Sequence, residues 1–174
     1  MTTAVTTLDD VQHVADQVAA GLHQLLHAEY WKLPGDDLLN AARTVEHLAR
    51  LTYAVQVAVA GEIDLAHLAQ THGQPSTAAL LRHALNIGPG DARGRVRAAQ
   101  AVLPQDAVSG GEIPPVLPAL GAALRGGVLG VEQVTIVVKT MSRIPTVIDL
   151  DIREQAETTL VVHAQGMDPT DLGR

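Results

Sequence analysis

The spacing of apolar side chains predicts helices along almost the whole chain. Apolar residues recur every three or four positions from Leu8 to Glu29 and again, along one seam, over residues 38–70. A continuous helix over residues 38–70 would be about 50 Å long, whereas a compact domain of this size has a radius of gyration of about 16 Å. Two outcomes fit: a break near Gly61, or a long spine helix along the molecule, whose apolar seam is then a candidate for pairing two copies. The spine is favoured.

Shorter helices follow, and capping residues mark where they start and end. Ser76 caps a helix that runs to about Asn86, and Pro89 suits the first turn of the next one, which ends at Leu103. Further helices are predicted over residues 116–125, 131–141 and 149–165, and a last one starts at Asp168. The β-branched residues at 134–139 also suit a strand, but the flanking pattern is helical and no partner strand is evident. A helix start so near the last residue is typical of an excerpt from a longer protein.

The fold class that follows is all-α: a multi-helix bundle with a long spine helix and a helix-turn-helix-like hairpin. An N-terminal helix and linker would occupy residues 1–35, and the helical domain residues 36–174. Hydrophobic residues make up 47% of the chain, but Phe is absent, so Ala, Val, Leu and Ile must build the core. Tyr30 and Trp31 are expected to anchor the first helix against the spine.

Composition also bears on the compartment. The chain has no cysteine, which excludes disulfides and thiolate zinc sites and fits a reducing cytoplasm. Its first residues lack the basic and apolar regions of a signal peptide, and no apolar run is long enough to span a bilayer. We therefore expect a cytoplasmic protein without a membrane partner.

The sequence lacks four motifs that are typical of enzymes. The phosphate-binding loop, the serine-hydrolase elbow, the zinc-protease helix and the Glu-x-x-His motif of di-iron bundles are missing. Three pairs have the spacing of metal ligands on a helix: Asp10/His13, Asp64/His67 and His23/His27. A zinc site needs a third ligand, which none of these pairs implies, so solvent-exposed histidines are the favoured interpretation. We predict no catalytic residue, no metal and no cofactor, and hence no enzymatic activity of this chain.

Positive charge is concentrated in residues 76–104, a stretch whose pattern predicts two helices joined by a tight turn. The net charge of the chain is −7, yet residues 82–97 hold four arginines and one aspartate. This arrangement is similar to a helix-turn-helix unit, although any tight helical hairpin has comparable spacing. The apolar skeleton of such a unit would be Leu81, Leu85, Ile87, Ala92 and Val96.

The polar residues of this hairpin are candidate contacts to double-stranded DNA. Arg93, Arg97 and Gln100 share an exposed flank of the second helix, and Arg82 lies on the first. Arg95 is expected to pair with an aspartate one turn earlier and so to serve the helix itself. The alternative is that these arginines only solubilise or brace an ordinary hairpin.

From the spine helix onward, three ordered blocks resemble a known family. They are STAALLRHALNIGPGDARGRVRAAQAVLP, LPALGAALRGGVLGVEQVTIVVKTMSRIP and REQAETTLVVHAQGMDPTDLGR. The chain is similar over residues 37–174 to the domain of unknown function 222, the thirteen-E-twelve repeat family of actinobacteria. In that family the helical region commonly precedes an HNH nuclease domain, which implies a DNA-processing context tied to mobile elements.

No catalytic residue carries over from this resemblance, because the nuclease's His-His pair and its downstream Asn and His have no counterpart in this chain. The expected function is a non-catalytic accessory domain of an HNH endonuclease-like protein, which positions DNA or a partner for a C-terminal nuclease. The alternative is a helical oligomerisation module with no role in nucleic-acid binding.

Overall fold

The chain divides into two compact units, residues 1–43 and 44–174. The computed structural model describes residues 5–106, 110–145 and 147–174. The sequence pattern places the division at residue 35, at the end of the linker. Between units 1 and 2 the chain continues without a break in helix α2 (Gly35–Leu65), which starts at the last residue of the predicted linker.

Unit 1 contains α1 (Leu8–Leu26), the 3-10 turn η1 (Tyr30–Lys32) and the first residues of α2. Thr7 and Asp10 form a capping box at the start of α1, which stabilises the helix through its otherwise unpaired N–H groups. No residue of α1 is buried, and Trp31 is 79% exposed. The expectation that Trp31 is a buried anchor is therefore wrong, because no residue of unit 1 from Val5 onward covers this side chain.

The predicted spine helix is confirmed as α2, although it ends at Leu65 and not near residue 70. His67 takes a left-handed conformation with φ of 51°, which stops the helix, and a separate turn of helix, α3 (Leu68–Thr71), follows. The helix does not break at Gly61. A Cβ atom at Gly61 would lie only 3.3 Å from the Ala99 Cβ, so the missing side chain lets α2 cross α5 closely.

The remaining elements follow the predicted order closely. They are α4 (Thr77–Leu85), α5 (Pro89–Val102), β1 (Gln105–Asp106), β2 (Glu112–Ile113), α6 (Pro118–Arg125), α7 (Val131–Met141), α8 (Leu150–Gly166) and α9 (Pro169–Leu172). The all-α class is confirmed, and residues 134–139 are helical as expected. The small antiparallel hairpin, which pairs Gln105 with Ile113, was not predicted because two-residue strands carry no readable alternation.

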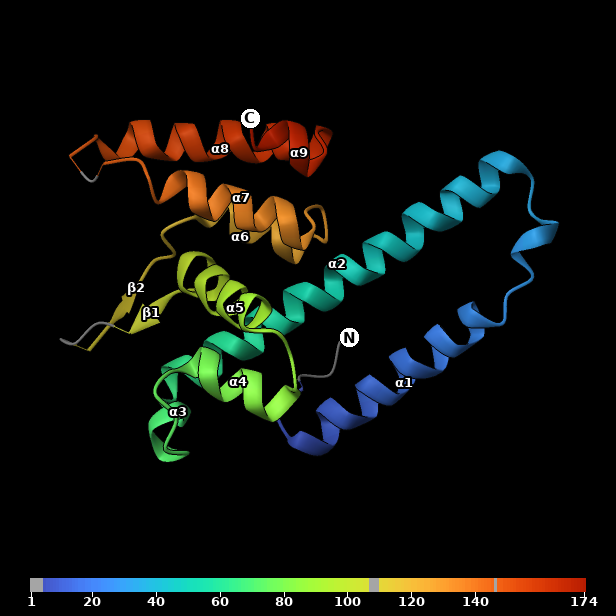
Figure 1. Cartoon of the computed structure of the whole chain (residues 1–174), viewed down its shortest axis with the longest axis horizontal. Helices are drawn as coiled ribbons and strands as arrows, with labels where there is room; N and C mark the ends of the chain where they lie inside the picture. Colours follow the sequence, from blue (N-terminus) through green and yellow to red (C-terminus); the bar gives the residue numbers. More distant parts are fainter. Residues whose placement is uncertain (1–4, 107–109, 146) are drawn as a thin grey trace. The chain divides into compact units, whose positions relative to one another are not determined.

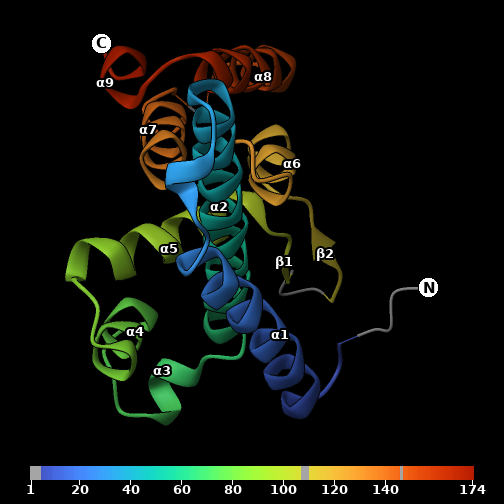
Figure 2. The same ribbon diagram turned by 90° about the vertical axis from the view of Figure 1, so that its right-hand side faces the viewer.

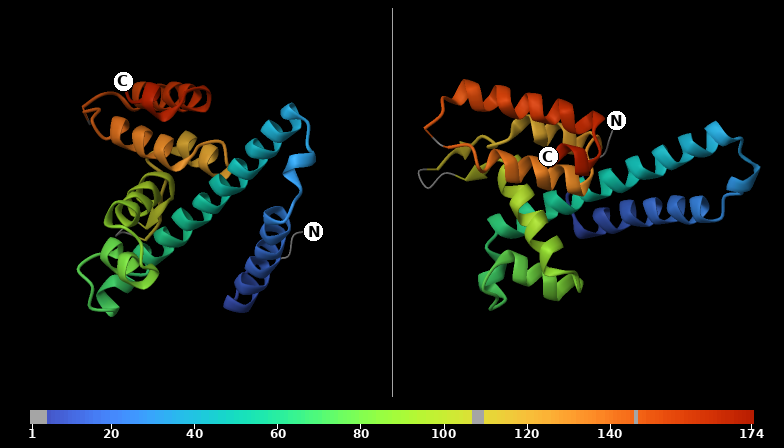
Figure 3. Two further views of the ribbon diagram at one scale, coloured as in Figure 1. Left: turned by 45° about the vertical axis from the view of Figure 1, so that its right-hand side comes forward. Right: turned by 45° about the horizontal axis from the view of Figure 1, so that its top comes forward.

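The helices of unit 2 pack around two apolar clusters. Figure 1 gives their order along the chain, and Figure 2 shows α7 and α6 below α8, on either side of α2 in that view. The α3 and α4 helices lie at the far end of the unit from α8 (Figure 3). The larger cluster includes Val57, Val102, Leu120 and Val137, and the smaller one joins Ala60 of α2 to α4 and α5. Within the described residues, no helix combines the length and apolar character that crossing a bilayer requires.

Two buried polar side chains hold helix ends together in unit 2. Glu157 of α8 is 2% exposed, and its carboxylate accepts the Leu120 N–H at 2.8 Å, near the start of α6. Gln133 of α7 donates from Nε2 to the carbonyl oxygens of Ala164 at 2.5 Å and Met167 at 2.9 Å. Both side chains therefore satisfy backbone groups that a helix cannot satisfy internally.

Candidate nucleic-acid interface

The α4–α5 hairpin is built by local signals at both helix ends. The Ser76 hydroxyl accepts the Ala79 N–H at 3.2 Å, and Asn86 ends α4 in a left-handed conformation with φ of 52°. Pro89 occupies the first position of α5, as predicted. These caps turn the chain tightly between the two helices.

Most of the predicted apolar skeleton of the hairpin is confirmed. Leu81, Ala92 and Val96 are buried in one cluster with Ala60 of α2, and Ile87 packs partly against it. The exception is Leu85, which is 52% exposed because it lies in the last turn of α4, away from that cluster. The hairpin is therefore anchored on α2 through its inner face, and its opposite side stays open to solvent.

Three predicted DNA contacts carry free charge on this hairpin. Arg82 of α4 and Arg93 and Arg97 of α5 are exposed, and no hydrogen bond or ion pair of their side chains occurs within the described residues. The two α5 arginines lie one helical turn apart, so they share a flank of the helix. Their guanidinium groups are available to an anionic ligand without first breaking an ion pair.

Arg95 behaves differently from its neighbours. Its Nε and Nη2 atoms donate to the two oxygens of Asp91, each at 2.8 Å, and its side chain is only 12% exposed. The predicted structural role of Arg95 is therefore confirmed. Near this pair, the buried hydroxyl of Tyr53 has no hydrogen-bond partner among the described residues. Burial raises the pKa of Tyr53, the Asp91 charge raises it further, and the Arg95 charge opposes both.

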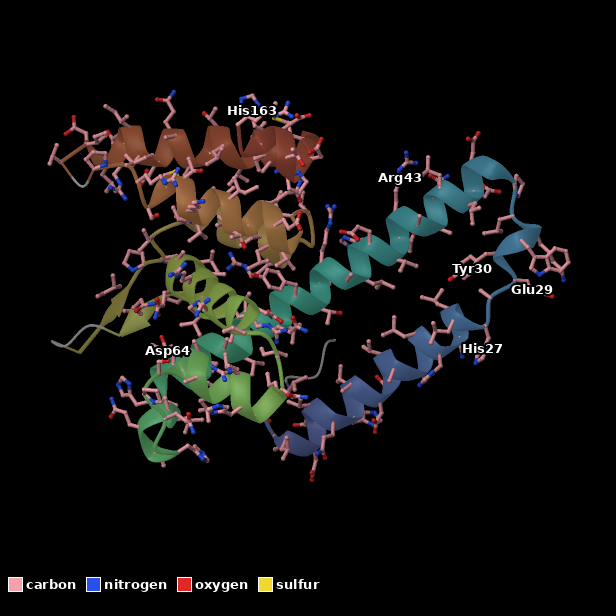
Figure 4. All side chains as sticks on the ribbon, viewed as in Figure 1. His27, Glu29, Tyr30, Arg43, Asp64 and His163 are labelled. Atoms are coloured by element: carbon pink, nitrogen blue, oxygen red, sulfur yellow. The ribbon has the colours of Figure 1, made fainter. Side chains whose placement is uncertain are left out.

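Gln100, the fourth predicted DNA contact, is engaged within the protein. Its Nε2 donates to Asp64 Oδ2 at 2.8 Å, and Asp64 Oδ1 accepts the Thr77 hydroxyl at 2.5 Å. Figure 4 labels Asp64 near the end of α2 that meets the hairpin. This network ties α2, α4 and α5 together. Sequence spacing held no signal for it, because Asp64 and Gln100 are 36 residues apart.

The described residues offer little for a cofactor or a metal. No group of three or more His, Asp or Glu side chains among them is placed to hold a metal ion. An apolar groove of about 480 Å³ runs between α7 and α8 and includes Ile152 and His163. A polar hollow of about 440 Å³ is lined by Glu46, Glu132 and Asp168 against a single arginine, an acidic lining unsuited to phosphate.

The curated relatives of this chain are longer proteins of undetermined function. An uncharacterized protein of Mycobacterium tuberculosis is 35% identical over 80 residues, which cover 46% of this chain and 18% of that protein. Another uncharacterized protein, from Mycobacterium bovis, is 26% identical over 166 residues, or 95% of this chain and 36% of the relative. The chain thus spans well under half of either relative. No solved structure shows significant similarity to it.

The family profile that matches covers the whole of the α4–α5 hairpin and all of the α6–α9 helices. The match extends over residues 39–174, which include nearly all of α2 and every element that follows it. On that coverage, the chain belongs to the family described as a domain of unknown function, DUF222.

Proposed function

We propose that unit 2 is a non-catalytic helical module that holds the phosphate backbone of double-stranded DNA through the α4–α5 hairpin. The observation that carries this proposal is a set of exposed guanidinium groups on one anchored hairpin that have no ion-pair partner in the described part of the chain: Arg82, Arg93 and Arg97. Binding at phosphates releases condensed counterions, so a few such contacts give measurable affinity even in an acidic protein.

The engagement of Gln100 bears on what kind of DNA contact the hairpin makes. A glutamine amide reads adenine only when its N–H and carbonyl groups are both free to reach the base edge. Here Asp64 holds the amide nitrogen of Gln100 at 2.8 Å. We assign the remaining contacts, which are arginines, to phosphates, and because phosphates carry no sequence information the proposed interaction is sequence-independent.

The module is proposed to serve a longer protein. The matched mycobacterial relatives extend well beyond it, since the chain covers only 18% or 36% of their length. The resemblance to helical regions that precede HNH nucleases suggests the partner domain. We propose that the hairpin positions DNA for such a nuclease, which lies outside this chain and would supply all of the chemistry.

The DNA proposal predicts a specific change in salt dependence. With the Arg93→Ala/Arg97→Ala variant, the slope of log K against log salt concentration should become shallower by about 1.8, because each arginine that neutralises a phosphate contributes about 0.9 to it. The measurement is fluorescence anisotropy of a labelled duplex across a salt series.

A matched control distinguishes the loss of a DNA contact from the loss of positive charge on the protein. Lys139 and Arg143 are exposed cations near the end of α7, so Lys139→Ala/Arg143→Ala removes the same charge at another site. This control should leave the slope close to that of the wild type. An unchanged slope in the hairpin variant, or an equal change in the control, would rule out the proposed interface.

A second candidate function is association between helical modules without any DNA. One observation favours it: the side of α2 that faces away from the bundle carries exposed apolar residues, including Val45, Val55 and Val59. Monomeric proteins seldom leave a continuous apolar strip of this kind in contact with water unless it binds something.

A further inference from the structure

One face of α2 within unit 2 is apolar although no described residue of unit 2 covers it. Val55 and Val59 each lie two residues from the buried Val57, which places them about 160° around the helix from it. Their exposed fractions are 63% and 52%, against 1% for Val57. The helix therefore has an inner apolar face, which the bundle buries, and an outer one.

The outer face has the residue spacing of a helix–helix seam. Its positions alternate by three and four residues, as in a coiled coil: Val45, Leu48, Thr52, Val55 and Val59. The only hydroxyl among them is already satisfied, because Thr52 Oγ1 donates to the Leu48 carbonyl at 2.9 Å. The residues that flank the seam are small or uncharged, among them Ala49 and Ala58, which permits close approach of a second helix.

The ionisable side chains of this stretch all lie elsewhere on α2. His47 Nδ1 lies 3.2 Å from the Gly127 carbonyl oxygen, and Arg50 bonds both Glu46 and the Val128 carbonyl, at 2.9 and 2.5 Å. These residues face the loop between α6 and α7, and Tyr53 is buried. On a helix whose outer face is solvated, charged side chains lie on that face. Over this part of α2 they lie toward the bundle instead, and the outer face is apolar.

We propose that two copies of this chain pair through the outer face of α2, with the five seam residues at the contact. This inference rests on the second candidate function and names its surface and its partner. A second copy fits because a two-fold contact presents the same patch on both sides, and this patch has no charge to repel its own image. The net charge of −7 would oppose most other self-contacts.

The size of the seam sets the expected strength of pairing. Within unit 2 the seam runs from Val45 to Val59, which is 15 residues of α2 or about 22 Å. A strip of that length and about 10 Å wide is smaller than the roughly 800 Å² per partner of a standard interface. We therefore expect weak, reversible pairing that appears at micromolar concentrations or above.

Sedimentation equilibrium of the full chain over a concentration series tests the proposal. The weight-average mass should rise with concentration from 18.3 kDa toward twice that value. The Val55→Glu/Val59→Glu variant should weaken pairing at least about tenfold, because it places like charges in the seam and removes buried apolar surface. Helicity and unfolding midpoint should stay unchanged, since both side chains are exposed.

The matched control is Val131→Glu/Val162→Glu, which adds the same charge at two valines that are 49% and 60% exposed outside the seam. It should pair like the wild type. Association that persists unchanged in the seam variant would overturn the proposed face while leaving the second candidate function standing. A chain that stays monomeric at all concentrations would overturn both, whatever its DNA binding.

Discussion

Replacing Glu157 by alanine is expected to destabilise unit 2 by about 3 kcal/mol, because it removes the acceptor at the start of a buried helix. The α6 helix has no side-chain cap of its own. Its Leu120 N–H bonds the Glu157 carboxylate at 2.8 Å, and the Ala119 N–H reaches the same group. In the alanine variant both N–H groups would lose this partner, and the fully buried Leu120 would lie beside a new cavity.

Glutamine at position 157 is the matched comparison. It keeps the shape of the side chain and one carbonyl acceptor, so Glu157→Gln should lose less than half as much stability as the alanine variant. Urea unfolding followed by circular dichroism measures the stability of both variants. If the alanine variant unfolded at the wild-type urea concentration, the capping role of Glu157 would be refuted.

The same carboxyl group should make stability depend on pH. Burial raises the pKa of Glu157 above its ordinary value of 4.5, with the charge of Glu154 acting in the same direction, while the two backbone N–H groups oppose the shift. A raised pKa means that the folded state holds the proton more tightly than the unfolded state. The contribution of this group is therefore largest below pH 4.5 and declines as pH rises through the folded-state pKa.

Comparing the free energy of unfolding of the wild type and Glu157→Gln across the acidic range isolates this effect. As pH rises, the free energy of unfolding of the wild type should fall relative to that of Glu157→Gln. Above the folded-state pKa of Glu157 the difference should become constant. A difference that does not change with pH would show that Glu157 has the same pKa in both states.

Local signals in the sequence were enough to place most helix starts. Ser76, Pro89 and Asp168 each begin the helix that their residue types predict, because a cap or a first-turn proline acts on the next few backbone N–H groups. The pairing of Arg95 with Asp91 was predictable for the same reason, since the two residues lie one helical turn apart.

Interactions between distant segments were not predictable from one sequence. Glu157 and Leu120 are 37 residues apart, and Gln100 meets its partner 36 residues away, so neither pair leaves a periodic pattern. The exposure of Trp31 was missed for a related reason: burial depends on what packs over a residue, and residue type alone does not determine it. Only the structure shows that Gln100 and Arg95 bind other residues of the protein. The set of candidate DNA contacts therefore reduces to Arg82, Arg93 and Arg97.

Replacing Gln133 by leucine is expected to cost about 3 kcal/mol of stability, although leucine has a similar volume and the site is buried. The amide satisfies three backbone groups at once. Besides its two donor bonds to Ala164 and Met167, its Oε1 accepts the Gly130 N–H at 2.9 Å. Leucine would remove this partner from the Ala164 and Met167 carbonyls, at the end of α8 and just after it, and from the Gly130 N–H just before α7.

The loss of stability in the Gln133→Leu variant should be greatest where α7, α8 and α9 meet. Hydrogen exchange should therefore accelerate over residues 164–174 by more than it does in α4, where no partner of Gln133 lies. Gln155→Leu is the control, because Gln155 is an exposed glutamine of α8 and its replacement should alter stability by less than about 0.5 kcal/mol. Equal stability losses in the two variants would mean that the fold tolerates unpaired helix ends at this junction, and that packing alone holds α7 against α8.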